Sequence, residues 1–382
     1  MMTNKQFSED VRALYLHIPF CSTICHYCDF YKMRAKPEVK VKYIDYLIKE
    51  MARWAPLHPL ITTVYIGGGT PSALPLPLLQ KLLSALHDYW DLSHVLEFTI
   101  EANPGDITAD FLTLISKYHI NRLSLGIQSF NENKLKLLGR QHTREEAILA
   151  LKLCHQYQLE NVNVDIIFGV PTESFSILKS DLQQAISHHA KHISLYALIL
   201  EEKTVLAHWQ AKGLFSEMSD DKQSKLYEKA QHYLSSQSYK QYEISNFCLD
   251  GYQSRHNLVY WNNEPYLALG ASASYYLAQT RYTNPHHLER YFHGVDLLKM
   301  PFDEQIRLSK TEQMREHLML GLRKITGINL KSFKERYHCD VLSMFPVINE
   351  LISKKMLILK DNHLFIPQDK LFLSNEVLVR FF

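Results

Sequence analysis

The sequence predicts an α/β fold, a partial (β/α)6 TIM-like barrel with a smaller C-terminal helical and winged-helix-like domain. Six short apolar segments of strand type recur through the first half of the chain. Stretches with apolar residues at helical spacing lie between them. Strands that alternate with helices form a parallel sheet. No second run of long strands precedes the first, which favours one partial barrel over two separate sheets.

Each predicted strand is a short apolar run. In chain order they are ALYLHI (13–18), TVYIGG (63–68), VLEFTIEA (95–102), NRLSLGIQ (121–128), NVNVDIIFG (161–169) and HISLYAL (192–198). The helical stretches are predicted at 41–54, 77–90, 109–119 and 144–158. In barrels of this kind the functional groups gather at the carboxyl ends of the strands. Those ends are therefore the place to look for a site.

The second half of the chain changes character twice. We assign residues 1–205 to the barrel and 206–298 to a segment, rich in Tyr and His, that closes it. Residues 299–382 form a predicted third unit, with helical patterns at 311–324, 328–338 and 341–356 and a hairpin at 356–367. Helices that end in a hairpin indicate a winged-helix-like module. Because this module lacks a dense basic stripe, we interpret it as an interaction module rather than a nucleic-acid reader.

Charge and composition narrow the function classes. The chain has 382 residues, with 42 Lys and Arg against 40 Asp and Glu, so nothing demands a nucleic acid or an anionic membrane as partner. No uninterrupted apolar run reaches the length of a membrane span. The first residues, MMTNKQFSEDVR, lack the apolar core of a signal peptide. These features predict a cytoplasmic protein.

The most informative local feature is a group of three cysteines, Cys21, Cys25 and Cys28, directly after the first predicted strand. Three thiolates are an incomplete ligand set for structural zinc but suit an iron-sulfur cluster with one iron left open. Zinc remains an alternative because His17 and His26 are close in sequence. A disulfide is the other alternative, and it requires an oxidising compartment.

Polar residues and glycines stand at the ends of later strands. The second strand runs into GGGTP (67–71), where backbone N–H groups are available to a carboxylate or phosphate. Glu101, Gln128 and Asp165 each lie at or near the end of an apolar run. A buried carboxylate without a partner is costly, so these side chains need a ligand or protein partners such as a helix N-terminus or barrel backbone. Arg140 is a candidate counter-charge for a ligand carboxylate.

The cysteine spacing, with an aromatic residue before the third cysteine, resembles the radical S-adenosylmethionine (SAM) family. Membership implies a 4Fe-4S cluster on the three cysteines, with SAM chelated by the open iron. The similarity extends to HIPFC, GGGTPS, EANPGD, RLSLGIQSF, LGRQH, NVDIIFGVP and SLYALILEE, from about residue 12 to 205. Together these segments resemble the oxygen-independent coproporphyrinogen dehydrogenase group. The resemblance implies SAM contacts at Tyr15, Gly68, Gly69, Thr70, Glu101, Gln128, Arg140, Asp165, Ala197 and Ser274.

Two departures separate the chain from the dehydrogenases of that group. They carry a fourth cysteine two residues after the third, where this chain has Phe30, and a longer arm than the twenty residues that precede Cys21. The chain instead carries His256, Asn257, Tyr260 and Trp261 in an HNxxYW arrangement, which resembles the motif of a heme-chaperone branch of the same group. An imidazole beside aromatic rings suits heme. A histidine in such surroundings is also a common packing residue.

The resemblance therefore implies a heme chaperone with a 4Fe-4S cluster, SAM and heme as cofactors. The implied partners are heme, an electron donor for the cluster and an acceptor such as a respiratory heme protein, with a homodimer and peripheral membrane contact open. Whether the chain is also an enzyme stays open. The alternatives are coproporphyrinogen dehydrogenase or another radical SAM reaction on a tetrapyrrole, and more distantly a radical SAM enzyme that modifies RNA.

Overall fold

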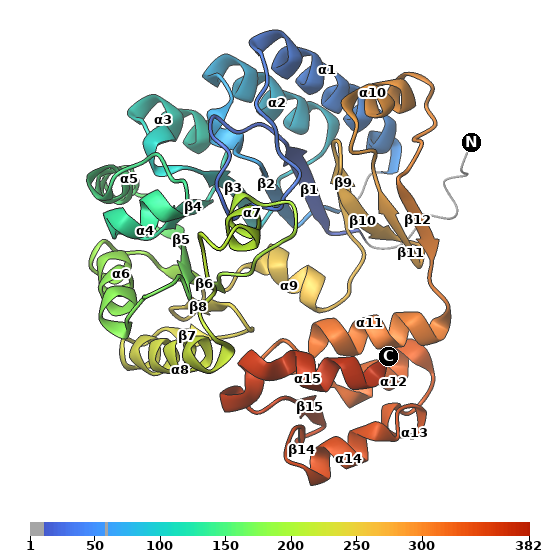
Figure 1. Ribbon diagram of the computed structural model, residues 1–382. Coiled ribbons are helices and arrows are strands. Elements are labelled where there is room, and N and C mark those ends of the chain that lie inside the picture. The colour runs from blue at the N-terminus through green and yellow to red at the C-terminus, as the bar shows by residue number, and fades with distance from the viewer. Residues whose placement is uncertain (1–10, 58–59) are drawn as a thin grey trace.

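The structure of the protein, a computed structural model, describes residues 11–57 and 60–382. Its centre is one curved sheet in the strand order β7-β8-β6-β5-β4-β3-β2-β1-β9 (Figure 1). The six central strands run parallel and in sequence order. They are β1 (Ala13–Ile18), β2 (Thr63–Gly68), β3 (Glu97–Ala102), β4 (Arg122–Gln128), β5 (Asn161–Phe168) and β6 (His192–Ala197). The predicted partial barrel is confirmed.

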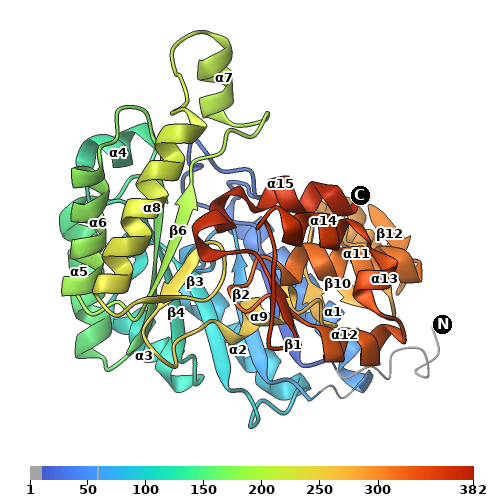
Figure 2. The same ribbon diagram turned by 90° about the horizontal axis from the view of Figure 1, so that it is seen from below.

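Helices cover the convex face of this sheet. The strands have alternating or continuous buried residues because both faces are packed, as parallel sheets require. The covering helices are α1 (Pro37–Trp54), α2 (Leu76–Tyr89), α3 (Ala109–Lys117), α4 (Glu132–Leu137), α5 (Arg144–Gln156) and α6 (Phe175–Ser187). The four helices predicted from the sequence are among them. After β6 come α7 (Val205–Ala211), which projects from the rest of the molecule (Figure 2), and α8 (Asp220–Ser236).

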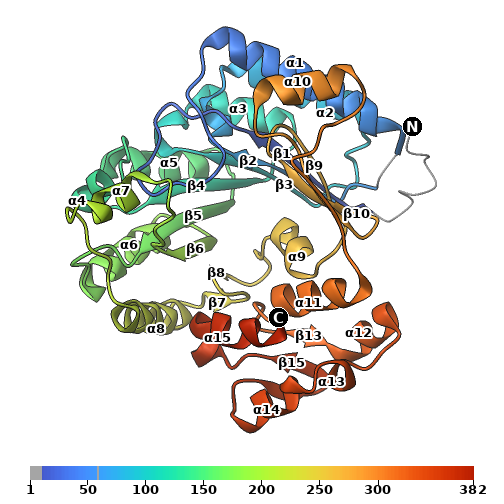
Figure 3. The same ribbon diagram turned by 45° about the vertical axis from the view of Figure 1, so that its right-hand side comes forward.

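Three short strands extend the sheet beyond the predicted six. At one edge β8 (Asn246–Cys248) pairs antiparallel with β6, and β7 (Lys240–Gln241) pairs with β8. At the other edge β9 (Leu267–Leu269) pairs parallel with β1. Among the described residues the two edge strands do not pair with each other, so the barrel stays open. Helix α9 (Arg255–Trp261) lies on this open side (Figure 3).

A buried carboxylate fixes the β9 edge. Glu50 of α1 accepts hydrogen bonds from Gly270 N (2.8 Å), Asn284 Nδ2 (3.0 Å) and Tyr291 Oη (2.8 Å). Gly270 has φ +105°, and a Cβ there would lie 2.5 Å from the Tyr43 hydroxyl, so this turn requires glycine. Burial raises the pKa of Glu50. These contacts join residues more than two hundred positions apart in sequence, which local patterns cannot predict.

The C-terminal part has its own buried cluster. After β10 (Ser274–Leu277), β11 (Thr280–Thr283), α10 (Leu288–Asp296) and β12 (Glu304–Arg307), the chain forms α11 (Lys310–Gly321), β13 (Ile328–Asn329), α12 (Leu330–Tyr337), α13 (Val341–Met344), α14 (Val347–Ser353), β14 (Ile358–Lys360), β15 (His363–Phe365) and α15 (Ser374–Leu378). Residues 314–381 contribute the cluster.

The hairpin expected in this C-terminal part is present. Strands β14 and β15 are joined by Asp361 and Asn362, both at positive φ, as a two-residue hairpin turn requires. The boundaries that we place at 205 and 298 remain proposals. Within the described residues, no helix combines the length and the apolar character needed to cross a bilayer.

Candidate functional site

A cavity of about 460 Å³ opens at the carboxyl ends of the central strands. Its walls come from the cysteine loop and from the ends of β2 to β6. Twelve of the predicted site residues line it: Cys21, Cys25, Cys28, Gly68, Gly69, Thr70, Glu101, Gln128, Arg140, Asp165, Ala197 and Asn257. Five predicted residues do not line it: Tyr15, His256, Tyr260, Trp261 and Ser274. Residues far apart in sequence thus meet at the end of the sheet where parallel-strand proteins place their sites.

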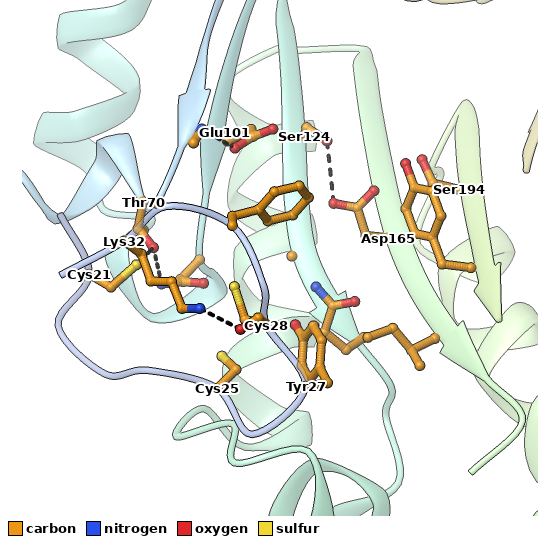
Figure 4. A pocket seen from close by; sticks show the side chains of 18 of the residues that line it. Cys21, Cys25, Tyr27, Cys28, Lys32, Thr70, Glu101, Ser124, Asp165 and Ser194 are labelled. Atoms are coloured by element: carbon orange, nitrogen blue, oxygen red, sulfur yellow. Dashed lines mark hydrogen bonds between the residues drawn. The ribbon is translucent and has the colours of Figure 1, made fainter. Parts of the chain in front are cut away.

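The cysteine loop is closed at its base by backbone hydrogen bonds. Cys21 N donates to the Met33 carbonyl (3.0 Å) and Met33 N to the Pro19 carbonyl (2.7 Å). The three cysteines are free thiols and surround one space at the cavity wall (Figure 4). This arrangement leaves all three thiols available to a cluster and is not that of a disulfide, while within the described residues no three Cys, His, Asp or Glu side chains are placed to hold a single metal ion.

Cationic and polar groups accompany these thiols. Arg140 Nη1 donates to Cys25 Sγ (3.2 Å) and Thr70 Oγ1 to Cys21 Sγ (3.5 Å), while the Lys32 ammonium donates to the Cys28 carbonyl. Burial raises the pKa of both Cys21 and Cys28. Thiolate formation here therefore needs a nearby positive charge or a bound metal, which deprotonates its thiol ligands.

Neither nearby histidine completes a zinc site. His17 has its Nδ1 bonded with the Tyr15 hydroxyl (3.0 Å) and its Nε2 with the Tyr31 carbonyl (3.0 Å). His26 Nδ1 bonds with the Leu137 carbonyl (2.9 Å). Neither ring lines the cavity. The geometry thus favours the three-cysteine interpretation over a four-ligand zinc site.

The glycine run after β2 brings the cysteine loop against the sheet. A Cβ on Gly69 would lie 2.9 Å from backbone atoms of residues 18–20, and one on Gly68, whose φ is +113°, would lie 2.5 Å from the His17 ring. The N–H groups of Gly68, Gly69 and Thr70 donate to protein acceptors at 2.8–3.0 Å. The sequence predicts these donors to serve a ligand; in the structure they hold the loop. The glycines position the cysteines through close packing.

Glu101 faces the cavity from β3 and has protein partners. It accepts hydrogen bonds from the Tyr65 hydroxyl (2.7 Å) and from Gly68 N (3.0 Å). Burial raises the pKa of Glu101 to about 7, although the hydrogen bond from Tyr65 lowers it. Around neutral pH this carboxyl can therefore hold or release a proton next to a bound ligand. Tyr65 is a site residue that the sequence did not indicate.

Asp165 faces the same space from β5. It accepts hydrogen bonds from Asn163 Nδ2 (2.8 Å) and Ser124 Oγ (3.5 Å), and burial raises its pKa. Figure 4 shows Glu101, Ser124 and Asp165 on successive strands around the cavity. Arg122, also in the lining, is 1% exposed, and within the described chain its Nε has no hydrogen-bond partner. A buried guanidinium with one unpaired donor indicates a site for an anionic or polar ligand.

Gln128 and Arg140 form the next wall. Gln128 ends β4 with φ +68°, a conformation that non-glycine residues rarely adopt and that often accompanies functional sites. Arg140 Nη2 donates to Asn103 Oδ1 (2.6 Å) and to the Gly126 carbonyl, besides its contact with Cys25. The resemblance predicts that Arg140 faces the SAM carboxylate. In the structure its bonds tie the cysteine loop to the β3 and β4 ends.

The HNxxYW residues lie on α9, whose start is held by a buried carboxylate. Glu97, the first residue of β3, accepts hydrogen bonds from Ser254 Oγ (3.2 Å), Arg255 N (2.8 Å) and His256 N (3.0 Å). The Ser254 hydroxyl also caps Asn257 N (3.3 Å). Free N–H groups at a helix start favour such an anion. Sequence reasoning missed Glu97; its only signal was a charged residue inside an otherwise apolar strand.

His256 is wholly enclosed. Its side chain is 0% exposed, with Nδ1 bonded with Thr63 Oγ1 (2.9 Å) and Nε2 with the Tyr260 hydroxyl (2.7 Å). Burial lowers the pKa of His256 to about 3, so the ring is neutral. Both nitrogens are occupied, and an iron ligand needs one of them free. Heme at the HNxxYW motif stays a prediction, and this conformation of His256 does not fit an iron ligand.

The other predicted residues outside the lining have structural contacts. The Tyr15 ring stacks on Tyr65 with centroids 6.0 Å apart, so it supports the partner of Glu101. Ser274 begins β10, is exposed, and bonds with Thr283 Oγ1 (3.0 Å). Asn257, by contrast, follows His256 on α9 and lines the cavity. One helix thus presents a sealed residue and a cavity residue side by side.

Comparisons with known proteins give matches along most of the chain. Residues 15–185 match the model of the Radical SAM superfamily, and residues 308–369 match the HemN C-terminal domain. The heme chaperone HemW of Lactococcus lactis subsp. lactis (strain IL1403) is 38% identical over 346 residues, 90% of each chain. The heme chaperone HemW of Bacillus subtilis (strain 168) is 33% identical over 371 residues, 96% of this chain and 98% of that protein.

Among solved structures, coproporphyrinogen III oxidase (HemN) from Escherichia coli superimposes with a TM-score of 0.84, at 19% identity, over 99% of this chain and 91% of that one. At that identity the likeness shows the fold. The chain is a radical SAM protein, and within that superfamily it belongs to the HemW heme chaperone family. At the level of the family, the predicted cofactors, a 4Fe-4S cluster, SAM and heme, are confirmed.

Proposed function

We propose that the chain is a heme chaperone that holds a 4Fe-4S cluster on Cys21, Cys25 and Cys28, binds SAM in the cavity beside them and passes heme to an acceptor protein. The observation that carries this proposal is the meeting of three free thiols with a polar cavity at one end of the sheet, in a chain so similar to proteins named heme chaperones. When bound, a cluster with an open iron supplies an anchor for SAM and a single electron.

The chain's own residues would bind and orient these groups. Arg122, Glu101 and Asp165 offer charge of both signs to the polar parts of SAM, and Gln128, Ala197 and Asn257 complete the walls. Glu101, with its pKa near 7, would hold a proton at its carboxyl when the ligand is anionic. Tyr15, Gly68, Gly69, Thr70, Arg140 and Ser274 are proposed SAM contacts as well.

The finer partners are part of the same proposal. A respiratory heme protein as acceptor, an electron donor for the cluster, a homodimer and contact with a membrane surface are consistent with a protein that delivers heme. A cytoplasmic location rests on the thiols, since cysteines that hold a cluster must stay reduced. The C-terminal domain, with its own buried cluster, is the proposed interaction module.

Anaerobic reconstitution tests the proposal. The full-length protein is loaded with iron and sulfide, hemin is added, and absorption spectra are recorded together with an assay for coproporphyrinogen conversion. Stoichiometric hemin binding without conversion is the expected result. Conversion to protoporphyrinogen without stable hemin binding would make the chain a dehydrogenase despite Phe30.

A further inference from the structure

Four large apolar side chains are exposed around the mouth of the cavity. Ile24 and Phe30 belong to the cysteine loop, Tyr196 to the end of β6 and Ile199 to the segment after it. They are 40%, 71%, 41% and 65% exposed, yet all four line the cavity. We call them the apolar rim. Apolar side chains that gather at the entrance of a cavity indicate a binding surface.

The interior of the cavity has the opposite character. Deeper in, the lining carries Glu101, Arg122 and Asp165, with Ser124 and Asn163 between them. Such groups suit a charged, hydrogen-bonding ligand. They give no reason for aromatic and aliphatic side chains to stay in contact with water at the entrance. The rim is therefore available to a second, apolar occupant outside the polar interior.

We propose that the apolar rim is the docking surface for heme, with the porphyrin face laid across Phe30, Ile24, Tyr196 and Ile199 at the entrance of the SAM cavity. This inference rests on the proposed function and names its site. A porphyrin is a broad, flat, apolar ring, which packs well against aromatic and branched side chains. Lys32, half-buried in the same lining, offers a cation to one propionate, whereas the exposed carboxylates Asp29 and Glu201 of that lining favour contact with the apolar face of the ring over contact with its propionates.

The alternative position for heme, at the HNxxYW motif, fits less well. His256 is sealed, and two hydrogen bonds must break before its ring can reach iron. The rim needs no such opening, because its side chains already face solvent.

The rim also suits release. No histidine occurs among the described residues that line the cavity. Heme on the rim is then held by apolar contact more than by strong iron ligation, which leaves the iron accessible to ligands of the acceptor. Affinity differences between related complexes arise mainly in the dissociation rate. A surface without an imidazole ligand therefore favours a carrier that must let its cargo go.

Charged substitutions on the rim test this inference. The full-length protein, reconstituted with its cluster and supplied with SAM, is titrated with hemin and followed by Soret absorbance. The variants are Phe30→Asp and Ile199→Asp. Each has a matched control of similar exposure elsewhere: Phe382→Asp (68%) and Leu96→Asp (60%). Exposed positions change folding stability little, so all four variants are expected to fold.

We expect each rim variant to weaken hemin binding by about tenfold, with the controls within about twofold of the parent protein. SAM affinity, measured by equilibrium dialysis, should stay unchanged in all four. If rim variants bind hemin as the controls do, the rim is not the site, although the proposed function survives. A loss of SAM binding that parallels the loss of hemin would make the rim part of the SAM site and overturn the inference. If the parent protein itself fails to bind hemin, the proposed function fails, and the inference fails with it.

Discussion

The cavity lining and the sealed face of helix α9, which carries His256, differ in how their polar side chains are used. In the cavity, Arg122 and Asn257 belong to the lining, and the buried Arg122 Nε has no hydrogen-bond partner within the described residues. On α9, His256 uses both ring nitrogens, and Glu97 accepts three hydrogen bonds from the start of the helix. The cavity lining therefore has polar groups that are available to a ligand, whereas the polar groups around His256 form hydrogen bonds that stabilise the fold.

This difference distinguishes a motif that can bind a ligand from a motif that stabilises the fold. The cysteine group and HNxxYW look alike in sequence, since both are short runs of residues that can bind iron. The structure places the three thiols around one space, whereas it places the imidazole behind a tyrosine and a threonine. Satisfied hydrogen bonds mark a structural role, because a buried polar group that has its partners gains little from a ligand.

The largest expected effect is loss of the cluster in Cys28→Ser. With two thiolates left, the site cannot hold a 4Fe-4S cluster, so iron and sulfide content after reconstitution should fall to background. Cys154→Ser is the matched control, because Cys154 is buried in α5 and burial raises the pKa of its thiol to about 12. It should keep the full cluster. A Cys28→Ser protein with its full iron content would show that a different residue completes the site.

Glu97→Ala should give the largest loss of stability on the α9 side. It removes the three hydrogen bonds that a carboxylate with 2% exposure accepts from the start of α9, besides a longer one from the Thr99 hydroxyl, and leaves two backbone N–H groups without partners. We expect the free energy of unfolding to fall by about 3 kcal/mol, because bonds to charged groups contribute more than neutral ones. Urea unfolding measures it, with exposed Glu376→Ala as control. A loss below about 0.5 kcal/mol would mean that α9 does not depend on this cap.

What the sequence could predict follows from how local each feature is. The six parallel strands carry continuous apolar runs, and the cysteine loop is contained within eight residues, so the order of residues along the chain was enough to locate both. Glu101, Gln128 and Asp165 followed from one rule, that parallel strands bring their carboxyl ends together. To apply that rule, it is enough to know where each strand ends along the chain, and no distance between residues has to be known.

The features that escaped prediction depend on long-range contacts. Strand β9 has three residues and is defined by pairing with β1, some 250 positions earlier. The seal on His256 comes from Thr63, and the cap on α9 comes from Glu97, each on a strand remote in sequence. No periodicity of the α9 segment contains this information. From the HNxxYW sequence alone, a histidine that binds heme could therefore not be distinguished from a histidine that packs in the core.

His256→Ala sharpens the comparison through its pH dependence. At pH 7 the loss of two buried hydrogen bonds should cost about 2 kcal/mol. The pKa of His256 is lowered to about 3 in the folded protein, so as pH falls below about 6.5 the unfolded chain takes up a proton that the folded chain refuses. The free energy of unfolding of the parent protein therefore falls as the pH falls. The variant lacks this imidazole, so its free energy of unfolding does not show this decrease.

The gap between the two proteins should shrink by about 2 kcal/mol between pH 7 and pH 5. Urea unfolding at the two pH values measures the gap, and exposed His94→Ala serves as the control. A constant gap would contradict a buried neutral ring and would reopen the case for His256 as a ligand.

The smallest expected effect comes from the next residue on the same helix. Asn257→Ala removes an amide that lines the cavity but leaves the helix cap, because the Ser254 hydroxyl accepts from the backbone N–H of residue 257. Stability should therefore change by less than about 0.5 kcal/mol, whereas SAM affinity in equilibrium dialysis should fall by about three- to tenfold. His256→Ala should show the reverse ranking, with a larger effect on stability than on SAM. If both variants lose stability equally and keep SAM, α9 is structural throughout, and the division between a sealed face and a cavity face of this helix is wrong.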